Sequence, residues 1–98
     1  MIVQNITIPE IATMLREAPA VLLYCHVRPD GDTFGSALAL KRALAGKPVE
    51  IITPDPIPPY IRFLSGGRTD YTKAALPAGF LSQEGLLRVV VEIGRAHV

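Results

Sequence analysis

The sequence predicts an α/β fold built on a doubly wound, Rossmann-like parallel sheet with flanking helices. Mainly apolar runs of strand length occur at 20–25, 49–52 and 86–91, as expected for strands buried on both faces of a parallel sheet. A helical segment separates the first two runs. Strand, helix and strand thus follow one another within about 30 residues, which is typical of a right-handed βαβ unit.

The composition indicates one small globular domain. The chain has 98 residues, of which 49% are apolar and 19% are charged, and this balance is typical of folded rather than disordered chains. The longest apolar runs are far too short to span a bilayer. Residues 1–4 show no basic region and no small-residue cleavage site, so no secretory signal is expected. Cys25 is the single cysteine and suits a reducing compartment, and we expect a cytoplasmic protein without a membrane contact.

Charge limits the class of partner. The net charge is +1, and lysine and arginine are scattered along the sequence. Proteins that grip a long duplex usually carry a basic stripe, because phosphate contacts supply much of the affinity. If the ligand is a nucleic acid, the sequence therefore favours a short oligomer or a nucleotide over a long duplex, and it leaves the oligomeric state open.

A first helix is predicted from about residue 7 to 18. Thr7 suits the cap position and Glu10 follows it three residues later. An apolar face recurs at helical spacing, and Pro19 ends the helix. The residues of that face are Ile8, Ile11, Leu15 and Ala18.

A second helix is predicted from about Thr33 to Ala45, with Gly46 as its C-terminal stop. Residues 53–59 contain four prolines and predict an extended loop. A short helical turn at 60–64 is broken by 65–67. Residues 68–84 show no clear periodicity.

Chemistry concentrates in the loop His26–Asp32, which directly follows the first buried strand. Ligands of open α/β sheets bind outside the carboxyl ends of the strands. Imidazole and carboxylate ligands suit Mn²⁺ or Mg²⁺, and Pro29 and Gly31 can shape a turn that aims Asp30 and Asp32 at neighbouring points. Free N–H groups of the helix start, expected near Gly35 and Ser36, would favour a phosphate.

Other interpretations of this loop were weighed. Pro-Asp-Gly-Asp is also a good surface turn before a helix capped by Asp32 or Thr33, and His26 at the strand exit favours a site over that turn. An EF-hand is excluded because no distal glutamate follows in register. A dinucleotide site is excluded because no G-x-G-x-x-G follows the first strand.

The run Tyr24–Leu40, YCHVRPDGDTFGSALAL, resembles the first motif of the DHH-family phosphoesterases. It is most similar to the RecJ-like branch of nano-RNases and pAp phosphatases. The stretch Ile52–Leu64, ITPDPIPPYIRFL, also resembles that branch. The similarity is dense from about residue 21 to 66.

The resemblance implies a hydrolase with a two-metal site. It implies that His26 and Asp30 hold one Mn²⁺ and Asp32 the other, with Mg²⁺ as the alternative ion. Ser36 is a substrate-binding candidate, although packing into the helix start is the preferred interpretation. The implied reaction is hydrolysis of phosphoester bonds in short oligoribonucleotides or in 3′-phosphoadenosine 5′-phosphate. The rival hypothesis is a non-catalytic nucleotide-binding or regulatory domain that retains the loop.

The sequence departs from the family at its C-terminal side. The bridging aspartate expected after the third strand is replaced by Glu92, and no Asp-His-His motif follows. Residues 93–98 match the translation, in one frame, of a widely used sequencing adapter (ATC GGA AGA GCA CAC GTC). The adapter begins with AG just before this stretch, and a native G followed by AG gives GAG, the codon for Glu92.

We therefore expect residues 1–92 to be the N-terminal part of a catalytic domain, a truncated doubly wound sheet, and 93–98 to be a non-native tail. This piece alone is expected to be inactive. The tail is expected to lie loose beyond Ile93. Long-read sequencing of the source locus across codon 92 tests this hypothesis, with Asp and a continuing reading frame as the expected result.

Overall fold

The computed structural model describes residues 8–25, 31–68, 70–92 and 95–97; of residues 8, 31–33, 62, 92 and 95–97 it describes the backbone alone. Within these ranges the elements are two α-helices, three 3-10 helices and four strands. In chain order they are α1 (Ile8–Glu17), β1 (Ala20–Cys25), α2 (Gly31–Ala43), β2 (Val49–Ile52), η1 (Pro59–Ser65), η2 (Lys73–Ala75), η3 (Phe80–Ser82), β3 (Leu86–Glu92) and β4 (Arg95–His97).

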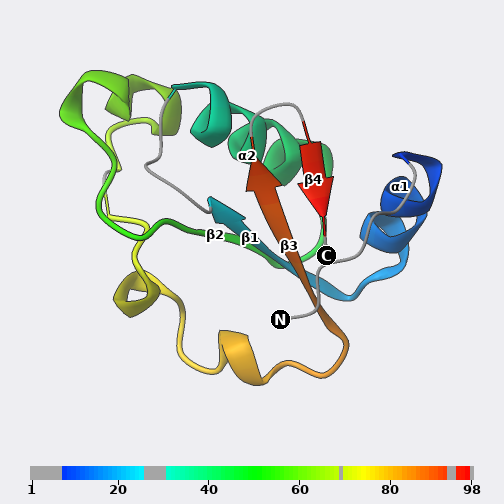
Figure 1. Cartoon of the computed structure of the whole chain (residues 1–98). Helices are drawn as coiled ribbons and strands as arrows, with labels where there is room; N and C mark the ends of the chain where they lie inside the picture. The colour runs from blue at the N-terminus through cyan, green and yellow to red at the C-terminus, as the bar shows by residue number, and fades with distance from the viewer. Residues whose placement is uncertain (1–7, 26–30, 69, 93–94, 98) are drawn as a thin grey trace.

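The strands form one sheet in the order β2-β1-β3-β4 (Figure 1). β1 pairs in parallel with β2 on one side and with β3 on the other. The predicted α/β fold with a parallel sheet and flanking helices is therefore confirmed. The bounds predicted for β1 and β2 agree with the structure, because a buried run bounded by proline or glycine leaves little freedom in where a strand ends.

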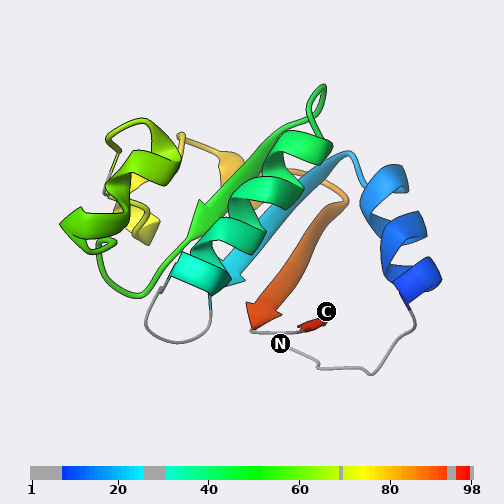
Figure 2. The same ribbon diagram turned by 90° about the horizontal axis from the view of Figure 1, so that it is seen from above.

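Helices cover the two faces of the sheet unequally. α1 and α2 pack on one face, and η2 and η3 lie on the other side (Figures 1 and 2). Alternate residues of each strand supply the two cores. Val21 and Leu23 face the α-helices, whereas Leu22 packs with Ile52 and Phe80 on the opposite face.

α2 begins at Gly31, two residues before the predicted start. Aspartate is favoured before and within the first turn of a helix, so the sequence around Asp30 and Asp32 supports the earlier start. Phe34 and Ala37 are fully buried against the sheet. Gly46 has a φ of +108°, a left-handed conformation that confirms it as the stop after α2.

The connection after β2 is extended through its prolines and then turns into η1, as predicted. Thr53 is buried; its amide donates to the Tyr71 carbonyl (2.9 Å) and its hydroxyl to the Asp55 carbonyl (2.6 Å). These bonds tie both loop segments to the end of β2. Within η1, Tyr60 and Phe63 are each 73% exposed.

The expectation of a loose tail is wrong for Arg95–His97. These residues form β4, which pairs antiparallel with β3 through Val90↔His97 and Glu92↔Arg95. A strand edge presents unpaired N–H and C=O groups. A short segment that folds back along β3 satisfies them, whatever its side chains are.

Candidate functional site

The carboxyl ends of β1 and β3 lie side by side. Cys25, the last residue of β1, is the register partner of Val91 in the parallel pair. The motif loop starts one residue after Cys25, and Glu92 follows Val91. The strand pairing therefore brings backbone position 92 to the edge of the sheet where the motif begins.

The start of α2 is anchored over this edge by an aromatic pair. Phe34 is fully buried, and its ring meets the ring of Tyr71 edge-on, with centroids 4.9 Å apart. Edge-to-face contact is a favoured geometry for aromatic rings. It holds the positive end of the helix dipole close to the sheet edge, where a negative group is stabilised.

Two expectations about the helix start are wrong. Because α2 begins at Gly31, the N–H groups without an intrahelical partner belong to the turn that starts there, and Gly35 and Ser36 lie one turn later. Asp32 and Thr33 are helical and do not cap α2.

The predicted metal ligands fall where the structure gives no side chains. His26 and Asp30 lie outside the described residues, as do the side chains of Asp32 and Glu92. Ser36 is an exposed residue of α2. The described part of the chain contains no group of three His, Cys, Asp or Glu able to hold a metal ion. Convergence of His26, Asp30 and Asp32 thus stays a prediction.

Residues that flank the motif belong to the sheet and its loops. Tyr24 and Cys25 belong to β1, and Cys25 is buried. Arg88 of β3 donates a hydrogen bond to the Tyr24 hydroxyl (3.1 Å). Asp55 is exposed in the bend after β2.

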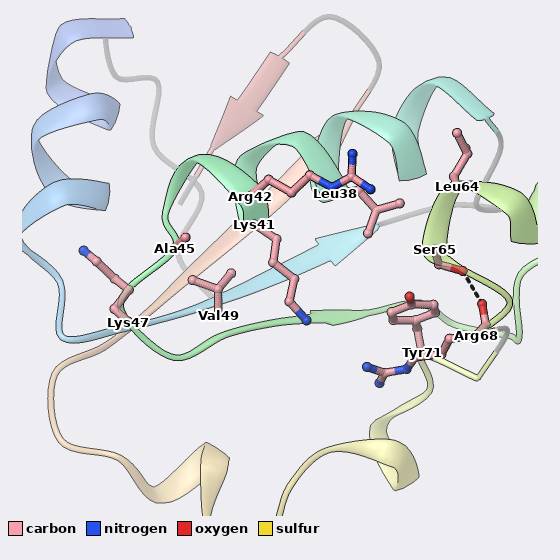
Figure 3. A pocket seen from close by; sticks show the side chains of 10 residues that line it. All are labelled: Leu38, Lys41, Arg42, Ala45, Lys47, Val49, Leu64, Ser65, Arg68 and Tyr71. Atoms are coloured by element: carbon pink, nitrogen blue, oxygen red, sulfur yellow. Dashed lines mark hydrogen bonds between the residues drawn. The ribbon is translucent and has the colours of Figure 1, made fainter.

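A second feature, a cleft of about 440 Å³, lies between α2 and the open edge of β2 (Figure 3). Its apolar lining includes Leu38 from α2, Val49 from β2 and Leu64 from η1. Its polar lining is cationic and comes from three segments. The four cations are Lys41, Arg42, Lys47 and Arg68.

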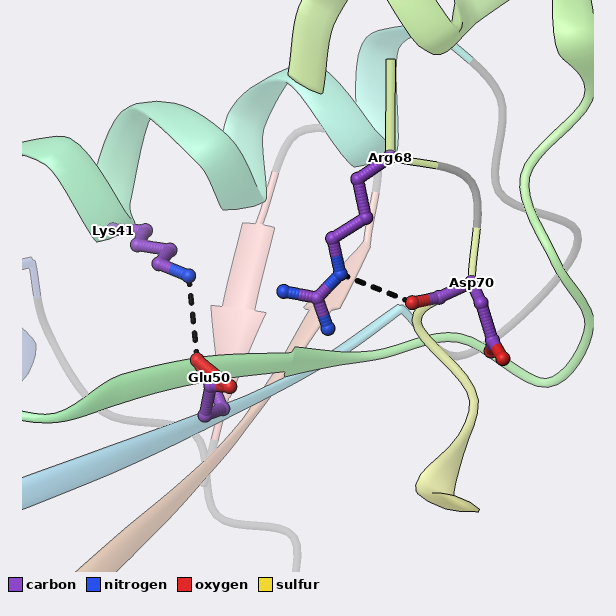
Figure 4. Close-up of polar contacts among 4 residues, drawn as sticks. All are labelled: Lys41, Glu50, Arg68 and Asp70. Atoms are coloured by element: carbon purple, nitrogen blue, oxygen red, sulfur yellow. Dashed lines mark hydrogen bonds and ion pairs between the residues drawn. The ribbon is translucent and has the colours of Figure 1, made fainter. Parts of the chain in front are cut away.

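The cations of this cleft differ in their partners. The Lys41 amine lies 3.3 Å from the Glu50 carboxylate, reaching across the edge of β2 (Figure 4). Lys47 donates to the carbonyl oxygens of Leu15, Arg16 and Ala18, at the C-terminal end of α1, where a cation complements the helix dipole. The guanidinium of Arg68 lies 4.1 Å from the centre of the Tyr71 ring.

Asp70 is near Arg68, but its carboxylate makes its hydrogen bonds within the loop. Its main-chain carbonyl accepts a hydrogen bond from Arg68 Nε (3.1 Å). Its carboxylate points away (Figure 4) and accepts from the hydroxyl and amide of Thr72, at 2.6 and 3.0 Å. These two bonds, with a smaller contribution from the charge of Arg68, lower the pKa of Asp70 below 3.8.

Comparison with known proteins gives no relative. No family model matches the chain, and neither do curated proteins or solved structures. Within the described residues, neither α-helix combines the length and apolar character needed to cross a membrane.

The cleft could not be found from sequence. Its cations lie up to 27 positions apart, and they come together because β2 returns beneath α2 and the segment after η1 folds back along β2. The only sequence signal, Lys41 and Arg42 at the end of a helix, is equally explained by the helix dipole.

Proposed function

We propose that this chain carries the first metal-binding motif of a DHH-type, metal-dependent phosphoesterase. The proposed reaction is hydrolysis of phosphoester bonds in short oligoribonucleotides or in nucleotides such as 3′-phosphoadenosine 5′-phosphate. The observation that supports this is the register Cys25↔Val91. It sets the start of the motif beside position 92, where the family resemblance implies a bridging carboxylate.

The donor types fit the implied ions. One imidazole and three carboxylates, from His26, Asp30, Asp32 and Glu92, are the ligands that Mn²⁺ and Mg²⁺ accept. When bound, two such ions supply an activated water and neutralise charge on the phosphoryl oxygens. The first turn of α2 adds a partial positive charge on the same side. The parallel pairing of the buried strands β1 and β3 supports this ligand set, because its proposed halves follow Cys25 of β1 and Val91 of β3, which are register partners.

Metal binding by the 98-residue protein tests this proposal directly. Titrated Mn²⁺ should broaden the amide resonances of Cys25, Phe34 and Val91 before others, because paramagnetic broadening falls steeply with distance. Asp30→Asn should weaken Mn²⁺ binding by roughly tenfold, within the range for loss of a charged ligand contact. Asp55→Asn, an exposed aspartate in a loop, is the matched control.

Broadening centred on other residues would contradict the proposal. So would an Asp55→Asn variant that loses as much Mn²⁺ affinity as Asp30→Asn does. Hydrolysis of a short oligoribonucleotide by this chain should be at trace level, since the resemblance implies that the remaining ligands belong to later motifs. Saturable nucleotide binding at the same edge without Mn²⁺ would favour the non-catalytic alternative.

A further inference from the structure

The cleft between α2 and β2 has a charge that the chain as a whole lacks. It gathers four of the ten lysine and arginine residues of a protein whose net charge is +1. No acidic residue is among the described residues that line it. Glu50, beside it, neutralises Lys41, and the Lys47 amine donates to the carbonyl oxygens at the end of α1. The excess that remains is the two positive charges of Arg42 and Arg68. An excess of one sign in a concave site attracts an oppositely charged ligand.

Arg68 is held in place for such a ligand. One face of its guanidinium rests on the Tyr71 ring and its Nε is bonded to the Asp70 carbonyl. Among the described residues, its two terminal nitrogens have no hydrogen-bond partner. Figure 3 shows the group at the mouth of the cleft. A planar guanidinium with a fixed orientation favours two-point binding of a phosphate or carboxylate.

The remaining lining selects among anions. Leu38, Val49 and Leu64 give the cleft an apolar part, which an inorganic ion would leave exposed to water. A volume of about 440 Å³ lies within the range of small-molecule sites. A phosphate monoester carries close to two negative charges, which matches the excess better than a single carboxylate does.

We propose that this cleft binds the phosphate monoester group of a nucleotide-sized organic ligand, with Arg68 as the main phosphate contact and Arg42 of α2 adding to the positive field. Arg42 lies eleven residues after Gly31 along α2, which at 1.5 Å per residue is about 16 Å from the helix start. The other end of the cleft, at Tyr71, adjoins Phe34 near the start of α2. The proposal rests on the residues of the cleft and not on the proposed function.

The test is a titration of the 98-residue protein, free of metal, followed by amide chemical shifts. Adenosine 5′-monophosphate should cause saturable shifts at Leu38, Ala45 and Ser65. Adenosine lacks the phosphate and inorganic phosphate lacks the nucleoside, so each should bind more weakly than the monophosphate. Arg68→Gln should reduce the affinity for the monophosphate by roughly tenfold, the range for a charge-assisted hydrogen bond.

Two further variants separate a local contact from general charge and from misfolding. Arg42→Gln changes an exposed side chain, so it leaves the fold intact and should weaken binding in the same direction. Arg88→Gln removes an arginine on the other face of the sheet and should leave the affinity unchanged. Equal loss in Arg88→Gln, equal binding of adenosine, or no saturation would each overturn the proposal.

Discussion

Replacement of Gly85 by alanine tests the packing between the starts of β1 and β3. Gly85 immediately precedes β3 and has a φ of +78°. A Cβ atom at this position would lie 2.8 Å from Cγ and 3.2 Å from Cδ of Pro19. Pro19 immediately precedes β1, and Ala20 is the register partner of Leu86. The two strands therefore approach each other here through a glycine and a proline ring.

The cost of Gly85→Ala has two parts. A left-handed backbone costs a non-glycine residue about 1–2 kcal/mol, and overpacking against a ring that cannot swing away costs about 1–3 kcal/mol. Alanine recovers about 0.4–1 kcal/mol by restricting the unfolded chain. We expect the free energy of unfolding to fall by about 2–3 kcal/mol, a large share of the about 5–15 kcal/mol typical of a domain.

Gly79→Ala is the matched control. Gly79 has the same φ of +78°, but no heavy atom lies within 4 Å of its built Cβ. Urea unfolding followed by circular dichroism should show a loss of about 1 kcal/mol for Gly79→Ala, the backbone cost alone. Equal losses in the two variants would refute the contact with Pro19. No loss in either would refute the backbone argument as well.

Two other predictions follow from burial and from the Asp70 turn. Phe34→Ala should lower the free energy of unfolding by about 3–5 kcal/mol, because it empties a fully buried site. Phe63 is 73% exposed, so Phe63→Ala should change the free energy of unfolding by less than about 0.5 kcal/mol. Similar losses in the two variants would contradict the assigned core. The bonds from Thr72 lower the folded-state pKa of Asp70, so their stabilisation is present above the unfolded pKa and is lost as pH falls through the folded one. Carbon-detected titration of the Asp70 carboxyl should give a pKa below 3.8 that rises in Thr72→Val; an unchanged pKa would refute this cause.

The sequence predicted the sheet well because its signals there are local. β1 and β2 are apolar runs that follow Pro19 and Pro48 and lead into polar loops. The apolar composition and the residues that bound each run therefore predict the same strand. The start of α2 was misplaced because Asp30-Gly31-Asp32 suits both a turn and a helix start, and packing of Phe34 decides between them. β4 was missed because pairing with β3 uses backbone groups, which carry no sequence signal.

The dipole of α2 offers a simpler electrostatic explanation for the charged residues of both candidate sites. Its macrodipole favours carboxylates at its start, where Asp32 stands, and cations in its last turns, where Lys41 and Arg42 stand. Helix stability alone thus explains part of each pattern. His26 and Arg68 are not part of α2, and the dipole gives no reason for their residue types.

The deciding variants are therefore those outside the helix. Substituting His26 should weaken Mn²⁺ binding without changing the stability of α2. Arg68→Gln should likewise weaken binding of the phosphate ester without changing the stability of α2. If Mn²⁺ and the monophosphate respond only to substitutions at Asp32, Lys41 and Arg42, general attraction to the helix ends explains both effects. A loss of ligand that follows His26 or Arg68 requires a site assembled from more than one segment.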